Sequence, residues 1–101
     1  MKVNNLNGTT YDTCKCGSWL EHWKKYSCQT LPTHCPEETC TQAPTVGSHI
    51  QKDSSTDRSW YIVPLCSRCN AKTGESLEVS DHVTLVVANV DSTCGKSVLA
   101  A

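Results

Sequence analysis

The chain has 101 residues and a formal net charge of −1, with nine basic and ten acidic residues. This length favours one domain with a modest core, and the near-neutral charge excludes a whole-molecule field that attracts nucleic acid or anionic membranes. There is no phenylalanine, and three tryptophans and three tyrosines supply the aromatic bulk. We therefore expect cross-links to supplement apolar burial.

No stretch of the sequence has the composition of a targeting or membrane segment. The opening residues, Met-Lys-Val-Asn-Asn-Leu, lack the apolar run of a signal peptide, and no later stretch approaches the ~20 apolar residues of a membrane span. We therefore expect a cytoplasmic protein without membrane association. In a reduced compartment cysteines favour metal ligation over disulfides.

The first expected regular element is a helix over residues 18–26, preceded by a polar arm or short hairpin over residues 1–13. Ser18 can cap this helix, and Glu21 completes a capping box. One stripe of the helix is aromatic and consists of Trp19, Trp23 and Tyr26. We expect it to pack in the core, since the chain needs its tryptophans inside. Base stacking beside lysines is the alternative.

Beyond the helix the sequence predicts a loop and then mostly β-structure. Residues 27–44 are rich in proline and lack periodicity, as is typical of a loop that carries ligands. The expected strands lie over residues 45–51, 60–63, 77–79 and 83–90. Pro64 is expected to end the second strand, and residues 66–74 to form a short helical turn that Gly74 ends.

Four of the eight cysteines form two close pairs separated by about a quarter of the chain. Cys35 and Cys40 bracket Pro-Glu-Glu-Thr, and Cys66 and Cys69 bracket Ser-Arg. Two such pairs can place four thiolates at the corners of a tetrahedron, the geometry of a structural Zn²⁺. We therefore predict a structural zinc ion on these four residues. The alternative is a secreted, disulfide-rich protein, against which stand the missing signal sequence and the clustering of the cysteines.

The remaining cysteines suggest a second site. Cys14, Cys16 and Cys94, with His22 nearby in sequence, could hold a second zinc ion that ties the C-terminal part of the chain to its N-terminal part. Equally, these cysteines could be free buried thiols. Cys28 is the cysteine that we expect to remain unused.

The central segment resembles the ββα treble clef of HNH-type endonucleases that carry a structural zinc. The resemblance covers residues 35–74 and follows the order cysteine knuckle, strand, loop, strand and helix. On its first strand the family has an Asp-His or His-His dipeptide. In the segment Ser48-His49-Ile50, His49 matches the second residue of this dipeptide. Leu65-Cys66-Ser67-Arg68-Cys69-Asn70 matches the opening of its helix.

The resemblance implies roles for two further residues. His49 would be the general base that activates water, and Asn70 would lie near a catalytic Mg²⁺ or similar ion. However, Ser48 stands where the family has an Asp or His that ligates this ion, and Tyr61 stands where an Asn orients the base. The loop carboxylates Asp53 and Asp57 are possible substitute ligands.

We therefore predict a small α+β fold of a single domain over residues 1–101. A zinc-stabilised treble-clef (ββα) core over residues 35–74 carries an N-terminal helix and extra C-terminal β-strands. The expected function is that of an HNH-like zinc module that binds nucleic acid or a protein partner without catalysis. The alternative is a metal-dependent HNH-type DNA endonuclease with His49 as its general base.

Overall fold

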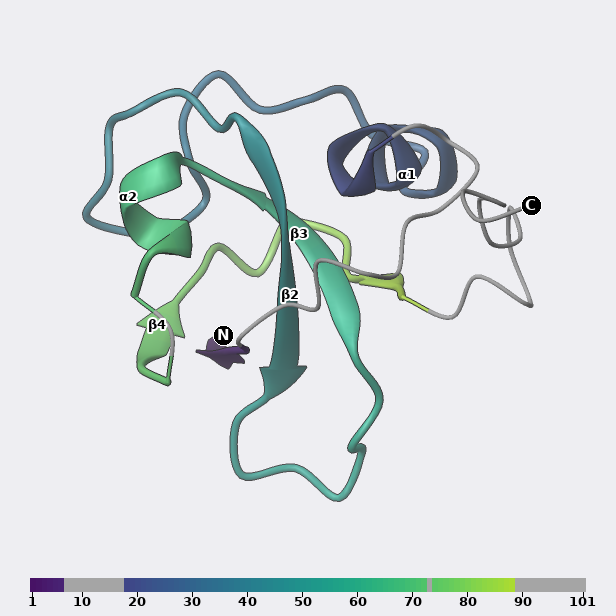
Figure 1. The fold of residues 1–101 in the computed structure, drawn as a ribbon, viewed down its shortest axis with the longest axis vertical. Helices are drawn as coiled ribbons and strands as arrows, with labels where there is room; N and C mark the ends of the chain where they lie inside the picture. The colour runs from purple at the N-terminus through teal and green to yellow at the C-terminus, as the bar shows by residue number, and fades with distance from the viewer. Residues whose placement is uncertain (7–17, 73, 89–101) are drawn as a thin grey trace, which may run out of the picture.

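The computed structural model of the chain describes residues 1–6, 18–72 and 74–88. They form a small α+β fold with a five-stranded antiparallel sheet and two helices (Figure 1). The strands are β1 (Lys2–Asn5), β2 (Val46–Lys52), β3 (Tyr61–Leu65), β4 (Ser76–Glu78) and β5 (Val86–Val87), and the helices are α1 (Trp19–Tyr26) and α2 (Ser67–Asn70). The strand order in the sheet is β4-β1-β2-β3-β5.

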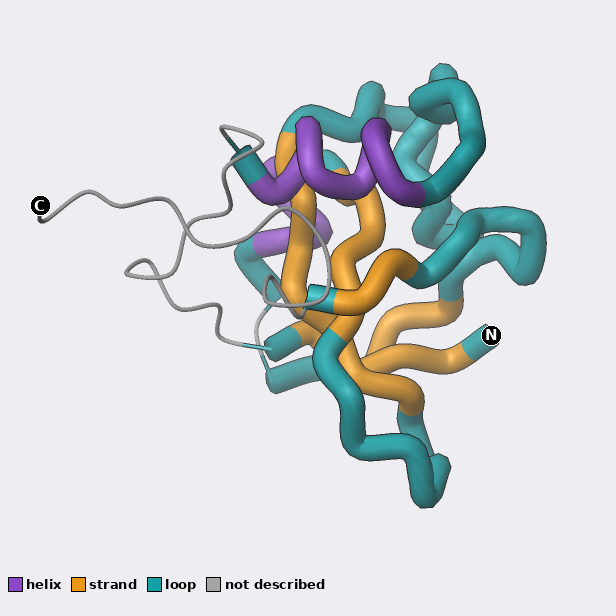
Figure 2. Tube along the Cα trace, turned by 90° about the vertical axis from the view of Figure 1, so that its right-hand side faces the viewer, coloured by secondary structure: helices purple, strands orange, loops and turns teal. Residues whose placement is uncertain are grey.

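The hairpin of β2 and β3 is the centre of the fold, and the two helices cover its opposite faces (Figures 1 and 2). On one face Gly47 lies against α1, where a Cβ atom would come within 2.4 Å of the backbone of Trp19. The next residue, Ser48, contacts Asn70 at the end of α2. Successive side chains of a strand point to opposite faces of the sheet, so α1 and α2 lie on different sides of the hairpin.

Helix α1 forms as the sequence predicts. Ser18 is its N-cap, and the Ser18 hydroxyl accepts a hydrogen bond from the backbone N–H of Glu21 at 3.1 Å. Trp23 is fully buried, and its indole N–H donates to the carbonyl of Thr84 at 2.8 Å. The prediction that all tryptophans are inside is wrong for Trp60, which is 39% exposed because it lies in the loop before β3.

The hydrophobic core combines side chains of the sheet with Trp23 of α1 and is built mainly from aliphatic residues. Its buried aliphatic members are Val3, Ile50, Ile62, Val63, Leu65, Leu77, Val79, Val83 and Val86. Four buried cysteines belong to the same cluster. The metal-ligand candidates are therefore part of the core.

The strands differ from the predicted ones at three places. The polar N-terminal segment provides β1, which pairs with both β2 and β4 and so lies inside the sheet. Pro64 does not end β3, which continues to Leu65, because the fixed φ of proline suits extended backbone. Within residues 83–88, strand structure is confined to Val86–Val87. Residues 7–13 of the expected arm or hairpin lie outside the described residues.

Candidate metal centre

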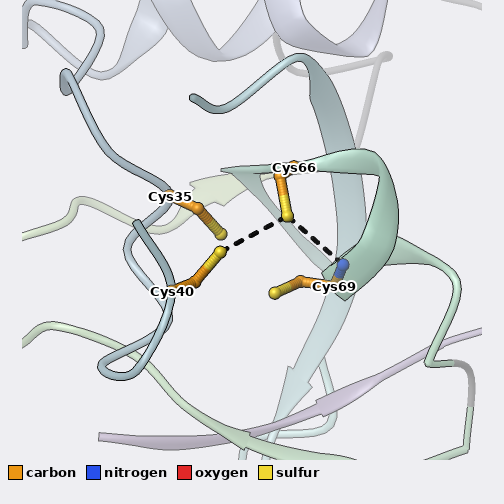
Figure 3. Close-up of side chains that lie close together, drawn as sticks. All are labelled: Cys35, Cys40, Cys66 and Cys69. Carbon is orange, nitrogen blue, oxygen red and sulfur yellow. Dashed lines mark hydrogen bonds between the residues drawn. The ribbon is translucent and has the colours of Figure 1, made fainter. Parts of the chain in front are cut away.

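The four cysteines of the two predicted pairs converge on one point (Figure 3). The sulfur atoms of Cys35, Cys40, Cys66 and Cys69 all lie within 4.8 Å of one another. A tetrahedron with Zn–S bonds of about 2.3 Å has sulfur atoms about 3.8 Å apart. The sulfur atoms of Cys40 and Cys66 lie 3.6 Å apart, which is close to this separation. The four thiols could therefore close around a single metal ion with little movement.

Different elements supply the two pairs. Cys35 and Cys40 come from the loop between α1 and β2, which runs from α1 to the side of the molecule where α2 lies (Figures 1 and 3). The backbone N–H of Cys35 donates to the carbonyl of Gln42 at 2.7 Å, and that of Cys40 donates to the carbonyl of Glu37 at 3.0 Å. These bonds close the loop, and the sulfur atoms of its two cysteines point toward those of Cys66 and Cys69 (Figure 3).

The other pair lies at the start of α2, directly after β3. Cys66 is the N-cap of this helix, with extended backbone, and its sulfur accepts a hydrogen bond from the backbone N–H of Cys69 at 3.4 Å. An N-cap side chain and the side chain three residues later point to the same side of a helix end. The Cys-x-x-Cys spacing therefore places both sulfur atoms on one side.

All four cysteines are buried, with exposed fractions of 8% or less. Burial raises the pKa of the Cys35 thiol and that of the Cys69 thiol, and neighbouring thiols add to the effect at Cys69. Burial also acts on Cys66, but hydrogen bonds from the backbone of Cys69 and from the neighbouring thiols outweigh it and lower the pKa to about 7. A divalent cation at the centre of the cluster would stabilise the thiolate forms against this burial.

These cysteines are free thiols, as is the exposed Cys28, which lies apart from the cluster. The prediction that Cys35, Cys40, Cys66 and Cys69 form one ligand group agrees with their close approach, and they could coordinate a metal ion. Of the proposed second group, Cys14, Cys16 and Cys94 lie outside the described residues. Its fourth member, His22, is fully buried on α1, where its Nε2 atom lies 2.9 Å from the carbonyl oxygen of Val87.

His49 lies on the α1 side of the hairpin between two tryptophans. Its ring centroid is 4.8 Å from the ring of Trp19 and 5.8 Å from that of Trp60, both edge to face. The residue is 8% exposed. The structure therefore encloses the imidazole in aromatic rings, which the sequence did not indicate.

Asn70 lies at the end of α2, and its side chain is engaged with β2. Its Oδ1 atom accepts a hydrogen bond from the hydroxyl of Ser48 at 2.6 Å. Ser48 and His49 are neighbours on one strand and point to opposite faces. Asn70 thus lies on the side of the hairpin where the metal centre is, whereas His49 lies on the side that α1 covers.

The sequence reasoning missed Asn5, which joins β1 to the second cysteine pair. Asn5 is 1% exposed, and its Nδ2 atom donates to the carbonyls of Cys69 at 3.2 Å and Asn70 at 2.9 Å. These carbonyls belong to the last turn of α2, and the Cys69 carbonyl also accepts a hydrogen bond from the backbone N–H of Lys72 at 3.2 Å. Only the pairing of β1 with β2 and β4 brings Asn5 here, so no local pattern could have identified it.

Among the helices of the described segments, none has the length and hydropathy to cross a membrane. Comparison with known proteins found no matching family model, no matching curated protein and no matching solved structure.

Proposed function

We propose that the chain is a zinc-binding module of HNH-like, treble-clef form that binds a partner, either nucleic acid or protein, without catalysis. The observation that carries this proposal is the convergence of four buried cysteine sulfurs within 4.8 Å. A closed set of four thiolates suits Zn²⁺ in a structural role, since a catalytic zinc site keeps one position open for water or substrate.

The order of the elements around the cysteines supports the treble-clef form. A loop with one cysteine pair is followed by the β2–β3 hairpin, and the second pair opens α2. This is the order of knuckle, hairpin and helix that the sequence resemblance implies. Helix α2 has four residues, so the zinc ion would fix a minimal version of this arrangement.

The surroundings of His49 and Asn70 support a module without catalysis. A general base needs to reach the water that it activates, and an imidazole that is 8% exposed and packed against two indole rings is poorly placed for this. The side-chain oxygen of Asn70 accepts a hydrogen bond from the hydroxyl of Ser48 and is thus engaged within the fold. Asp57, a possible substitute metal ligand, accepts a hydrogen bond from the hydroxyl of Tyr61 and forms an ion pair with Lys52.

Metal analysis tests the zinc site. We expect native mass spectrometry and elemental analysis to find zinc bound to the parent chain and to the Cys28→Ser variant, and to find it lost in Cys69→Ser. Cys28 is the matched control because it is a free, exposed cysteine outside the cluster. A metal-free chain whose mass shows the cysteines oxidised in pairs would sink the zinc proposal and favour the disulfide-rich alternative.

A plasmid-nicking assay with Mg²⁺ or Mn²⁺ tests the absence of catalysis. We expect the parent chain and His49→Ala to be equally inactive. Nicking by the parent that His49→Ala abolishes would establish the endonuclease alternative instead.

Titration with DNA at two salt concentrations tests the partner class, because binding through phosphate contacts weakens as salt rises.

A further inference from the structure

A groove lies beside the metal centre, between the loop that follows α1 and the loop that precedes β5. It encloses about 1050 Å³ and is lined by residues from segments 29–40 and 80–83. Cys35 and Cys40 are among the lining residues. A partner in this groove would therefore contact the loop that carries half of the metal-ligand candidates.

The charge of the groove is negative. Three carboxylates, those of Glu37, Glu38 and Asp81, line it together with the imidazoles of His34 and His82, and among the described residues no lysine or arginine does. The ammonium group of Met1 lies 2.7 Å from the carboxylate of Asp81 and offsets one of these charges. Glu38 is exposed, so its carboxylate is accessible from solvent.

The proposed zinc ion adds to this negative charge, and this step rests on the proposed function. Four thiolates carry more negative charge than one divalent ion neutralises, so the zinc-loaded centre is anionic as a whole. Two of these thiolates belong to Cys35 and Cys40 at the groove wall. Charges in a concave site focus their field toward the solvent in front of it.

We propose that this groove binds a lysine- or arginine-containing segment of a partner protein. The negative field repels the phosphate backbone of nucleic acid and attracts cationic side chains. Carboxylates and other polar groups share this lining with apolar side chains, so the charge of the groove distinguishes between candidate occupants. A basic peptide therefore matches the charge of the groove better than a nucleic acid does.

The experiment uses the full, zinc-loaded chain and a fluorescein-labelled peptide of repeating Gly-Lys-Gly-Arg sequence. Fluorescence anisotropy measures its binding, and a peptide with Glu at the basic positions and a single-stranded oligodeoxynucleotide are the comparison probes. We expect Glu38→Lys to weaken binding of the cationic peptide about fivefold or more, because it reverses a charge in the groove. Glu75→Lys makes the same charge change at an exposed residue that does not line the groove, and we expect an effect of about twofold or less.

Amide shifts in NMR spectra locate the bound peptide. Shifts concentrated in residues 29–38 and 80–83 support the proposal. It is overturned if Glu38→Lys and Glu75→Lys weaken binding equally, if the shifts lie elsewhere, or if the oligonucleotide binds more tightly than the cationic peptide. Zinc content measured on the same samples separates the zinc-site proposal from the docking proposal. A zinc-loaded chain that does not bind the peptide contradicts only the docking proposal.

Discussion

One hydrogen bond links the loop between β2 and β3 to the start of β3. The hydroxyl of Tyr61, at the start of β3, donates to the carboxylate of Asp57, and Lys52 lies 3.2 Å from the same oxygen. The Tyr61 hydroxyl, and then the backbone and hydroxyl of Ser59, hold the pKa of Asp57 well below its usual range. In return, the Asp57 carboxylate raises the pKa of Tyr61.

The signs of these two shifts define a pH window for this bond. Because the pKa of Asp57 is lowered on folding, its contribution to stability is present above its unfolded value of about 3.9 and is lost as the pH falls. Because the pKa of Tyr61 is raised, its contribution is present below about 10 and is lost as the pH rises. The bond therefore stabilises the loop across the neutral range.

Replacing the carboxylate by an amide tests this pairing. We expect Asp57→Asn to lower the pKa of Tyr61, because the neutral amide no longer opposes ionisation of the phenol. An absorbance titration of tyrosinate measures it, with Tyr61→Phe to identify the signal. Asp53→Asn changes a carboxylate of the same loop and should leave the titration unchanged. An unaltered Tyr61 pKa in Asp57→Asn would contradict the pairing.

Among the elements, β1 and α2 depend on each other through Asn5. The Asn5 side chain donates to two carbonyls of α2, and its backbone accepts a hydrogen bond from the N–H of Gly74 at 2.8 Å. Gly74 has a φ of +79°, which glycine adopts without strain and which lets the chain turn from α2 back to β4. Strand β1 thus supports α2, the helix that carries Cys66 and Cys69.

We expect Asn5→Ala to weaken zinc binding about tenfold, as is common when a group that orients metal ligands from behind is removed. Competition with a chromophoric chelator measures the affinity. Asn4→Ala is the matched control, because Asn4 lies on the same strand and its side chain accepts a hydrogen bond from the hydroxyl of Ser76, away from the cysteines. Equal affinities of the two variants would show that Asn5 does not support the site.

Local signals explain which elements the sequence predicted. Helix α1 has its cap and its apolar stripe within nine residues, and the spacing of Cys66 and Cys69 is itself a local feature of α2. Strand β1 has no such signal, since its Lys-Val-Asn-Asn sequence is poor in strand-forming residues and its place depends on β2 and β4. The aromatic surroundings of His49 and the role of Asn5 were likewise unpredictable, because both arise from long-range packing.

For the whole molecule, the candidate zinc site joins parts of the chain that the sheet alone does not hold together. The loop with Cys35 and Cys40 contains no helix, and its one strand-like contact is a single bridge between Glu37 and Val79. The other cysteine pair follows the central hairpin, and all four cysteines pack in the same core cluster as Trp23. A small core of this kind relies on such cross-links.

Removing the metal should therefore unfold more than the ligand loop. We expect a zinc chelator to shift tryptophan emission to longer wavelength and to reduce the far-ultraviolet circular dichroism of the sheet, because the fully buried Trp23 belongs to the same core. Structural zinc contributes about 10–16 kcal/mol to the folding of small metal-dependent domains, more than the whole stability of many domains this size. The same chelator saturated with zinc is the control. Unchanged emission and dichroism after complete metal removal would mean that the sheet holds the core without the ion.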